Sequence, residues 1–268
     1  MTKLTMAYSP CPNDTFMFCD VASGGLSASG YEVSVHLHDV ETLNRMALDS
    51  IYDVTKVSFH TYLLIRREYQ LLTAGAALGF GCGPLLVARR QLSKADLPRC
   101  RIAIPGELTT AHLLMRLWSP AATRKVFVPY DRVMPMIIAG EVDCGVIIHE
   151  SRFVYNDAGL ICIADLGQWW ETETGCPIPL GCVVARKSLG TKTTSELELL
   201  LRQAIRHSIS CPEAPSEYVR QNAIETSAEV QARHIRMFVN NFSLDLGETG
   251  QAAVAKLEER ARKAGITR

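Results

Sequence analysis

A histidine directly after an apolar run is the side chain of this sequence best placed to move protons. Residues 145–148 (Gly-Val-Ile-Ile) have the length of a buried β-strand, and His149 follows them at once. The carboxyl end of a parallel strand opens onto the cleft where α/β proteins bind ligands. Imidazole titrates near neutral pH, so His149 is a candidate general base, which Glu150 or another carboxylate could orient. A structural histidine with satisfied hydrogen bonds would leave the same pattern, and the residues alone leave both interpretations open.

Lys56 and Ser58 bring a positive charge and a hydroxyl to the end of another predicted strand, residues 54–59. Both groups suit recognition of an acidic, oxygen-rich ligand. A surface lysine and a capping serine would give the same sequence, so this segment is a candidate binding site and no more.

Two further segments have the pattern of helix starts, where free backbone N–H groups and the positive end of the helix dipole favour anions. In residues 106–111, Thr109 and Thr110 follow a glycine turn. Capping explains one of these threonines and does not need the second. In residues 9–16, two prolines stiffen a loop in which a side chain of residues 13–15 can cap the next helix.

Strand and helix patterns alternate along the chain and predict an α/β fold with parallel strands. Residues 84–89 and 179–186 are apolar strands that both end in Ala-Arg, on either side of a middle unit. We interpret them as two hinge strands, which predicts one lobe of residues 1–88 and 185–268 and a second lobe of residues 89–184. Two unrelated buried strands of common residues are the alternative.

Local patterns predict the individual elements that would position these side chains. The expected strands are residues 4–9, 31–37, 54–59, 101–104, 126–129 and 144–148. The expected helices are residues 16–19, 41–48, 62–69, 109–118, 132–139, 195–210, 215–221, 228–239 and 250–264.

The composition is that of a globular chain, with 268 residues of which 47% are hydrophobic and 21% charged. Lys plus Arg total 28 and Asp plus Glu total 28, and a net charge of zero argues against a general nucleic-acid binder. We expect no membrane span and no signal peptide, hence a cytoplasmic protein. The nine cysteines form no C-x-x-C and suit a reducing compartment, where most would be packing residues. We expect no metal, because His36 and His38 lack a third ligand.

Several long strings of this sequence resemble the 1,4-dihydroxy-6-naphthoate synthases, in order, from residue 4 to about residue 260. The strings are Ser9-Pro10-Cys11-Pro12-Asn13-Asp14-Thr15-Phe16, Asp39-Val40-Glu41-Thr42-Leu43-Asn44, Thr55-Lys56-Val57-Ser58, Gly83-Pro84-Leu85, Thr109-Thr110-Ala111, Pro129-Tyr130-Asp131, Ile147-Ile148-His149-Glu150-Ser151-Arg152-Phe153 and Val239-Asn240-Asn241-Phe242-Ser243-Leu244-Asp245-Leu246-Gly247.

This resemblance implies a two-lobed, periplasmic-binding-protein-like (type II) fold used as a cytoplasmic lyase of menaquinone biosynthesis. The implied substrate is cyclic dehypoxanthine futalosine, the product is 1,4-dihydroxy-6-naphthoate, and no cofactor is implied. By the motif match, His149 is the proton acceptor. The match also implies the residues that line the substrate site: Lys56, Val57, Ser58, Thr109, Thr110 and Ala111.

Two other functions fit the same scaffold. One is a non-catalytic solute-binding or sensor module, suggested by the hinge strands and the lack of a nucleophile motif. The other is a relative that acts on chorismate as a dehydratase. His60 and His112 lie next to the predicted site segments, so either could compete with His149 or assist it.

Overall fold

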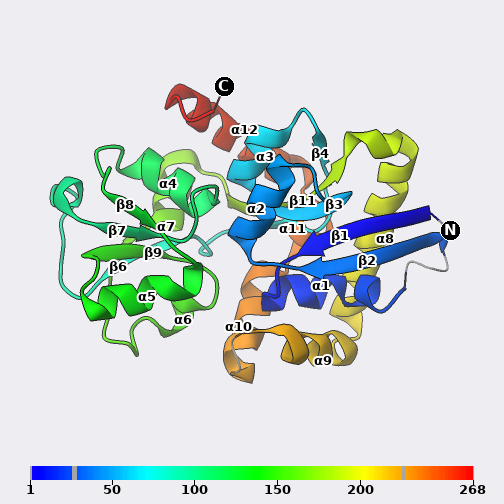
Figure 1. Cartoon of the computed structure of the whole chain (residues 1–268), viewed down its shortest axis with the longest axis horizontal. Helices are drawn as coiled ribbons and strands as arrows, with labels where there is room; N and C mark the ends of the chain where they lie inside the picture. The colour runs from blue at the N-terminus through cyan, green and yellow to red at the C-terminus, as the bar shows by residue number, and fades with distance from the viewer. Residues whose placement is uncertain (1, 26–28, 225–226, 268) are drawn as a thin grey trace.

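The computed structural model describes residues 2–25, 29–224 and 227–267, which form two α/β lobes lying side by side (Figure 1). The chain ends and the C-terminal helices build one lobe, and the middle of the chain builds the other. Within the described residues, none of the helices combines the length and the apolar character needed to cross a membrane.

The sheet of the first lobe joins strands from both ends of the chain. In the described residues its order is β2-β1-β3-β11-β4, and β5 also pairs with β11. Strands β1, β2 and β3 run parallel, whereas β11 is antiparallel to β3, β4 and β5. The strands are β1 (Thr2–Tyr8), β2 (Tyr31–Leu37), β3 (Val54–Ser58), β4 (Tyr69–Leu71), β5 (Ala77–Gly79) and β11 (Ile178–Arg186).

The sheet of the second lobe has the order β10-β6-β9-β7-β8 in the part of the chain that the structure describes. Strand β7 is parallel to β8 and β9, while β6 is antiparallel to β9 and β10. The strands are β6 (Leu85–Ala88), β7 (Ile102–Ile104), β8 (Lys125–Phe127), β9 (Cys144–Ile147) and β10 (Ile161–Asp165). The α/β class is confirmed. The expected parallel pairing holds among β1, β2 and β3 in the first sheet and among β7, β8 and β9 in the second, whereas the pairs that involve β6 or β11 are antiparallel.

The two predicted hinge strands each belong to a single sheet. Among the residues that the structure describes, β6 pairs within the second sheet and β11 within the first. The chain therefore crosses between the sheets before each of these strands, at residues 80–84 and 175–177. The predicted lobe limits at 88/89 and 184/185 therefore differ from this sheet membership. An apolar strand has the same pattern whichever sheet takes it, which is why the sequence did not locate the crossings.

Helices cover both sheets (Figure 1). The first lobe carries α1 (Pro12–Ala22), α2 (Val40–Leu48), α3 (Phe59–Ile65), α8 (Gly190–Ser210), α9 (Glu213–Asn222), α10 (Ala228–Phe238), α11 (Asn241–Leu244) and α12 (Gly247–Lys263). The second lobe carries α4 (Thr110–Trp118), α5 (Tyr130–Ala139), α6 (Ser151–Val154) and α7 (Leu166–Thr174). Short 3₁₀ turns lie at Leu97–Arg99 and Lys187–Leu189.

One buried apolar cluster continues across both lobes and holds them together. It includes Val57 and Val184 of the first sheet, Ile102 of the second, and Leu114 of α4. Trp170 of α7 is 1% exposed in the same cluster and donates its indole N–H to a backbone carbonyl, so it is a packing residue. The cavity described next is therefore set between two lobes with a shared core.

Candidate active site

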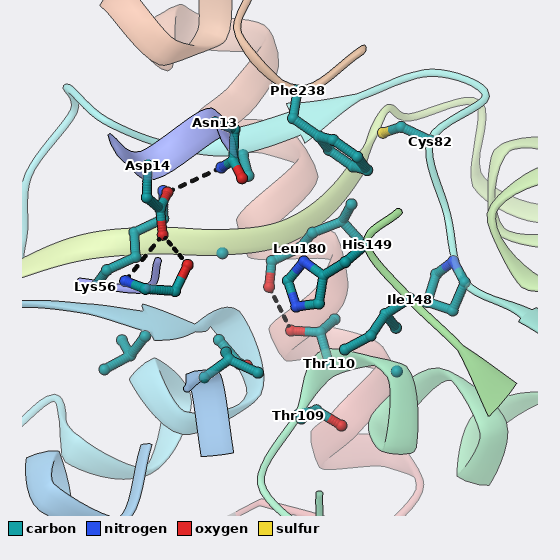
Figure 2. Close-up of a pocket in the computed structure, with 18 of the residues that line it drawn as sticks. Asn13, Asp14, Lys56, Cys82, Thr109, Thr110, Ile148, His149, Leu180 and Phe238 are labelled. Carbon is teal, nitrogen blue, oxygen red and sulfur yellow. Dashed lines mark hydrogen bonds and ion pairs between the residues drawn. The ribbon is translucent and has the colours of Figure 1, made fainter. Parts of the chain in front are cut away.

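A cavity lies between the lobes, where strand ends of both sheets meet helix starts. Its lining comes from α1, α2, β3, α4, β11 and α10 and from the segment after β9 (Figure 2). The structure brings all of the predicted site residues to this cavity: Lys56, Val57, Ser58, Thr109, Thr110, Ala111 and His149.

Lys56 faces the cavity as part of a buried ion pair. Its Nζ lies 2.7 Å from Asp14 Oδ1 and donates to the carbonyl of Gly75 at 2.8 Å, and the lysine is 5% exposed. Ser9 Oγ donates to the other Asp14 oxygen at 2.7 Å (Figure 2 shows the Lys56–Asp14 contact). Because an ammonium has three donors, Lys56 keeps one N–H for a ligand.

The start of α1 differs from the expectation that a side chain of residues 13–15 caps the helix. The helix begins at Pro12 with Cys11 as its N-cap residue, which makes no side-chain capping bond. Asp14 instead turns its carboxylate toward Lys56, and Asn13 donates its amide to Asp14 Oδ1 at 2.8 Å. The loop therefore places a carboxylate and an amide on the cavity wall, where the prolines hold the backbone.

Ser58 and Val57 complete the wall that β3 contributes. Ser58 Oγ accepts a hydrogen bond from Asn44 Nδ2 at 3.0 Å, and the Ser58 N–H donates to Asn44 Oδ1 at 2.8 Å. Val57 is fully buried. The serine hydroxyl keeps its own proton to donate into the cavity, as recognition of an oxygen-rich ligand requires.

The two threonines at the start of α4 have different partners. Thr109 caps the helix, since its hydroxyl accepts the His112 N–H at 3.2 Å. Thr110 donates its hydroxyl to the Leu180 carbonyl of β11 at 2.7 Å and accepts the His60 N–H at 3.2 Å, so it links the lobes. The first amides of a helix have no intrahelical acceptor, which leaves those of Thr110 and Ala111 suited to a carboxylate.

His149 lies on the opposite wall from Lys56 and adopts a left-handed backbone conformation, with φ of 55°. A non-glycine residue in this region carries about 1–2 kcal/mol of strain, and such residues are common at functional sites. The turn ends β9 and projects the ring beside Thr110 and Leu180 (Figure 2). His149 thus reaches the cavity through a strained backbone rather than by simply continuing the strand.

The His149 ring has one weak partner and one free nitrogen. Its Nδ1 lies 3.6 Å from Cys11 Sγ, while Nε2 is buried with no hydrogen-bond partner among the described residues. Burial lowers the pKa of His149, and the nearby Glu150 partly opposes this effect. Burial also raises the pKa of the Cys11 thiol well above its usual value, so the thiol stays protonated. At neutral pH the imidazole is therefore uncharged and able to accept a proton.

Residues that the sequence analysis did not assign to the site surround His149. Its ring stacks on His234 of α10 at 6.0 Å between centroids and meets Tyr130 edge-on at 5.0 Å. The Glu150 carboxylate accepts from Tyr130 and faces His234, so it does not orient His149 through a direct hydrogen bond. The spacing of His234, Gln231 and Phe238 could have indicated a buried helix face, but not what that face covers.

His60 and His112 lie behind the cavity wall rather than on it. Neither is among the lining residues, and their rings lie 6.4 Å apart. Burial lowers the pKa of each to about 4, and His112 Nδ1 pairs with the Glu107 carbonyl at 2.7 Å. Among the described residues, no group of three or more His, Cys, Asp or Glu side chains is arranged to hold a metal ion.

Known proteins with similar sequences are named for one activity. The profile of a family described as menaquinone biosynthesis matches residues 4–263. A Thermus thermophilus protein named 1,4-dihydroxy-6-naphthoate synthase is 44% identical over 266 residues, covering 99% of this chain and 96% of the relative. A Streptomyces coelicolor protein of the same name is 41% identical over 268 residues, covering 98% and 94%.

Solved structures give the fold. A protein of Archaeoglobus fulgidus superposes with a TM-score of 0.91 at 35% identity and covers 98% of both chains. The periplasmic aliphatic sulphonate binding protein of Escherichia coli superposes with a TM-score of 0.66 at 11% identity, covering 100% of this chain and 89% of that one. The second likeness concerns the fold alone, and it confirms the expected periplasmic-binding-protein-like architecture.

Proposed function

This chain belongs to the menaquinone biosynthesis family, and we propose that it is a 1,4-dihydroxy-6-naphthoate synthase with His149 as its general base. The protein is a lyase of menaquinone biosynthesis, and its proposed substrate is cyclic dehypoxanthine futalosine. The solute-binding and chorismate alternatives are not favoured, because the relatives that match nearly the whole chain are named as the synthase. The odd number of cysteines supports a cytoplasmic location.

The observation that carries the base assignment is the buried, unpartnered Nε2 of His149 on the cavity wall. A buried nitrogen without a partner costs free energy, so a ligand group that pairs with it is favoured to bind there. The lowered pKa of His149 keeps the ring neutral and ready to accept a proton from the substrate.

The two ends of the cavity suit the two ends of the proposed substrate. The amides at the start of α4 and the remaining N–H of Lys56 favour a carboxylate and hydroxyls. Apolar side chains of the same lining, such as Val40, Leu43 and Ile148, offer a surface for aromatic rings. Closure of the lobes around this ligand would exclude water and bring His149 against the reacting carbon.

The test is to incubate the purified protein with cyclic dehypoxanthine futalosine and detect 1,4-dihydroxy-6-naphthoate by mass spectrometry. We expect product from the parent and turnover at least about 10²-fold lower from a folded His149→Ala variant, the scale of a lost general base. His60→Ala is the matched control, since His60 lies outside the cavity lining. Near-parent turnover by His149→Ala would remove His149 from the mechanism, and no product from the parent would overturn the proposed activity.

A further inference from the structure

Glu150 and His234 form a buried acid–imidazole pair beside the proposed base. Glu150 is 8% exposed and His234 is 0% exposed. Glu150 Oε2 and His234 Nδ1 lie 3.8 Å apart, and both atoms are buried without a hydrogen-bond partner in the described part of the chain. Two buried polar atoms that face each other unpaired are costly in a folded protein, so their arrangement calls for a physical reason.

Asn13 fixes the tautomer of His234. The Asn13 amide nitrogen donates to Asp14 Oδ1 at 2.8 Å, because an amide oxygen in that place would face a carboxylate oxygen. Asn13 Oδ1 therefore faces His234 Nε2, 2.8 Å away, and can only accept. The His234 Nε2 must carry a hydrogen, which leaves Nδ1 of the neutral ring bare toward Glu150.

A bare Nδ1 and a bare carboxylate oxygen repel each other unless a proton lies on one of them. The second carboxylate oxygen, Oε1, already accepts the Tyr130 hydroxyl at 3.1 Å, which leaves Oε2 as the atom to carry the proton. We propose that the pair holds one shared proton, bound either to Glu150 Oε2 or to His234 Nδ1, and thereby acts as a neutral positioning pair for His149. The pair has zero net charge whether the proton lies on the carboxyl group or on the imidazole.

This role deepens the proposed function and rests on His149 being the base. The His149 and His234 rings stack with an interplanar angle of 11°, so any charge on the pair acts directly on His149. An unprotonated Glu150 raises the pKa of His149 against the effect of burial and so favours the imidazolium form, which cannot accept a proton. A pair that holds its proton weakens that effect and favours the neutral ring.

Other charged and titratable groups surround the two histidines. Burial lowers the pKa of His234 well below its usual value, and His149 lowers it further, which opposes a lone proton on either ring. Asp14 is matched by Lys56. The titratable or charged groups that face the pair and His149 come from several elements: Cys11, Asp14, Asp39, Lys56, Tyr130 and Arg152.

The first test needs no substrate. Nitrogen-15 NMR of the histidine-labelled, ligand-free protein reports which ring nitrogens carry hydrogen. Carbon-13 NMR of the Glu150 carboxyl group reports whether that group carries the proton. We expect His234 Nε2 to stay protonated across neutral pH, and either a protonated carboxyl group with a bare Nδ1 or a carboxylate with a protonated Nδ1. A bare Nδ1 together with a Glu150 carboxylate would overturn the shared proton.

The second test follows the acid limb of kcat/KM against pH. His234→Gln cannot hold the shared proton, so we expect Glu150 to become a carboxylate beside His149. The apparent pKa of the acid limb should then rise by about 1 pH unit. The double variant Glu150→Gln/His234→Gln is neutral again, and its limb returns to within about 0.3 pH unit of the parent value. The single variant Glu150→Gln keeps the donor toward His234 and leaves the limb in place.

These outcomes separate a charge effect from a packing effect. If the variants lower kcat without moving the limb, the pair is structural only and the proposal fails. If Glu150→Gln moves the limb down by about a unit, Glu150 is ionised in the parent and the proposal also fails. A parent that forms no naphthoate would defeat the proposed function, and the NMR measurement would still decide the pair.

Discussion

The two walls of the cavity differ in whether their polar side chains have hydrogen-bond partners. On the charged wall, formed by Ser9, Asn13, Asp14 and Lys56, each of these side chains has a partner within 3.0 Å. On the imidazole wall, formed by Thr109, Thr110, Ala111, Ile148 and His149, the His149 Nε2 has no partner in the described residues and the backbone is strained.

This difference gives the two walls different roles. A buried ion pair with complete hydrogen bonding holds its geometry, and removing one partner leaves an uncompensated charge. A neutral imidazole with a free nitrogen adds little to stability and keeps its capacity to react. We therefore expect stability to depend on the charged wall and turnover on the imidazole wall.

Replacing Lys56 tests this contrast with the largest effect on stability. Lys56→Met keeps the aliphatic stem but leaves Asp14 buried without its countercharge, so the free energy of unfolding should fall by about 3–5 kcal/mol. His149→Gln on the other wall should change it by less than about 1 kcal/mol, because it removes one weak hydrogen bond to Cys11 and ring contacts with His234 and Tyr130 but leaves no buried charge unpaired. Urea unfolding of both variants measures the difference.

A double variant shows whether the charge is the cause. Lys56→Met/Asp14→Asn removes both charges and should regain at least half of the lost stability. Equal losses in the single and double variants would mean that packing of the lysine stem, rather than the ion pair, holds this wall.

The predicted site residues line the cavity, and their positions follow from chain direction. In α/β folds the ends of strands face ligand clefts, and Ser58 ends β3 of the first sheet while His149 follows β9 of the second, so both lie near helix starts such as Thr110. The contacts of Lys56 were not predictable in the same way. Its pairing with Asp14 and with the Gly75 carbonyl depends on how β1, β3 and the loop after β4 lie in space.

Other features depended on long-range contacts that no local pattern contains. The helix expected at residues 62–69 lies at 59–65, because Tyr69 pairs with Arg186 in the sheet and donates its hydroxyl to the Tyr52 carbonyl. His234 comes from a helix whose polar-apolar pattern shows a buried face but not its neighbour. The antiparallel β6 and β11 needed knowledge of which sheet each strand joins.

The histidines behind the imidazole wall should make the protein sensitive to acid. His60 and His112 have pKa values of about 4 in the folded protein, against about 6.5 in an unfolded chain. Between these values the unfolded state binds more protons, so stability is full above pH 6.5 and falls as the pH drops toward 4. We expect His60 to contribute roughly 2–3 kcal/mol of this loss.

Unfolding free energies of the parent and of His60→Leu, measured from pH 7 to pH 4, check this expectation. The His60→Leu variant should lose less stability over this range than the parent. His36→Gln is the matched control, since His36 is exposed. Parallel curves for the parent and His60→Leu would show that His60 titrates normally in the folded protein.

Thr110 gives the smallest effect and the sharpest test of the contrast, because it lies on the imidazole wall and its hydroxyl has hydrogen-bond partners in the first lobe. Thr110→Val keeps the shape but leaves the Leu180 carbonyl and the His60 N–H unpaired, at a cost of about 1–2 kcal/mol in unfolding free energy. Thr110→Ser retains the hydroxyl and should lose less than half as much. Since this hydroxyl links α4 to β11, its loss should also loosen the wall that carries His149 and lower kcat more than it raises KM. A change in KM alone would mean that Thr110 serves ligand binding and that the imidazole wall does not depend on this link for its geometry.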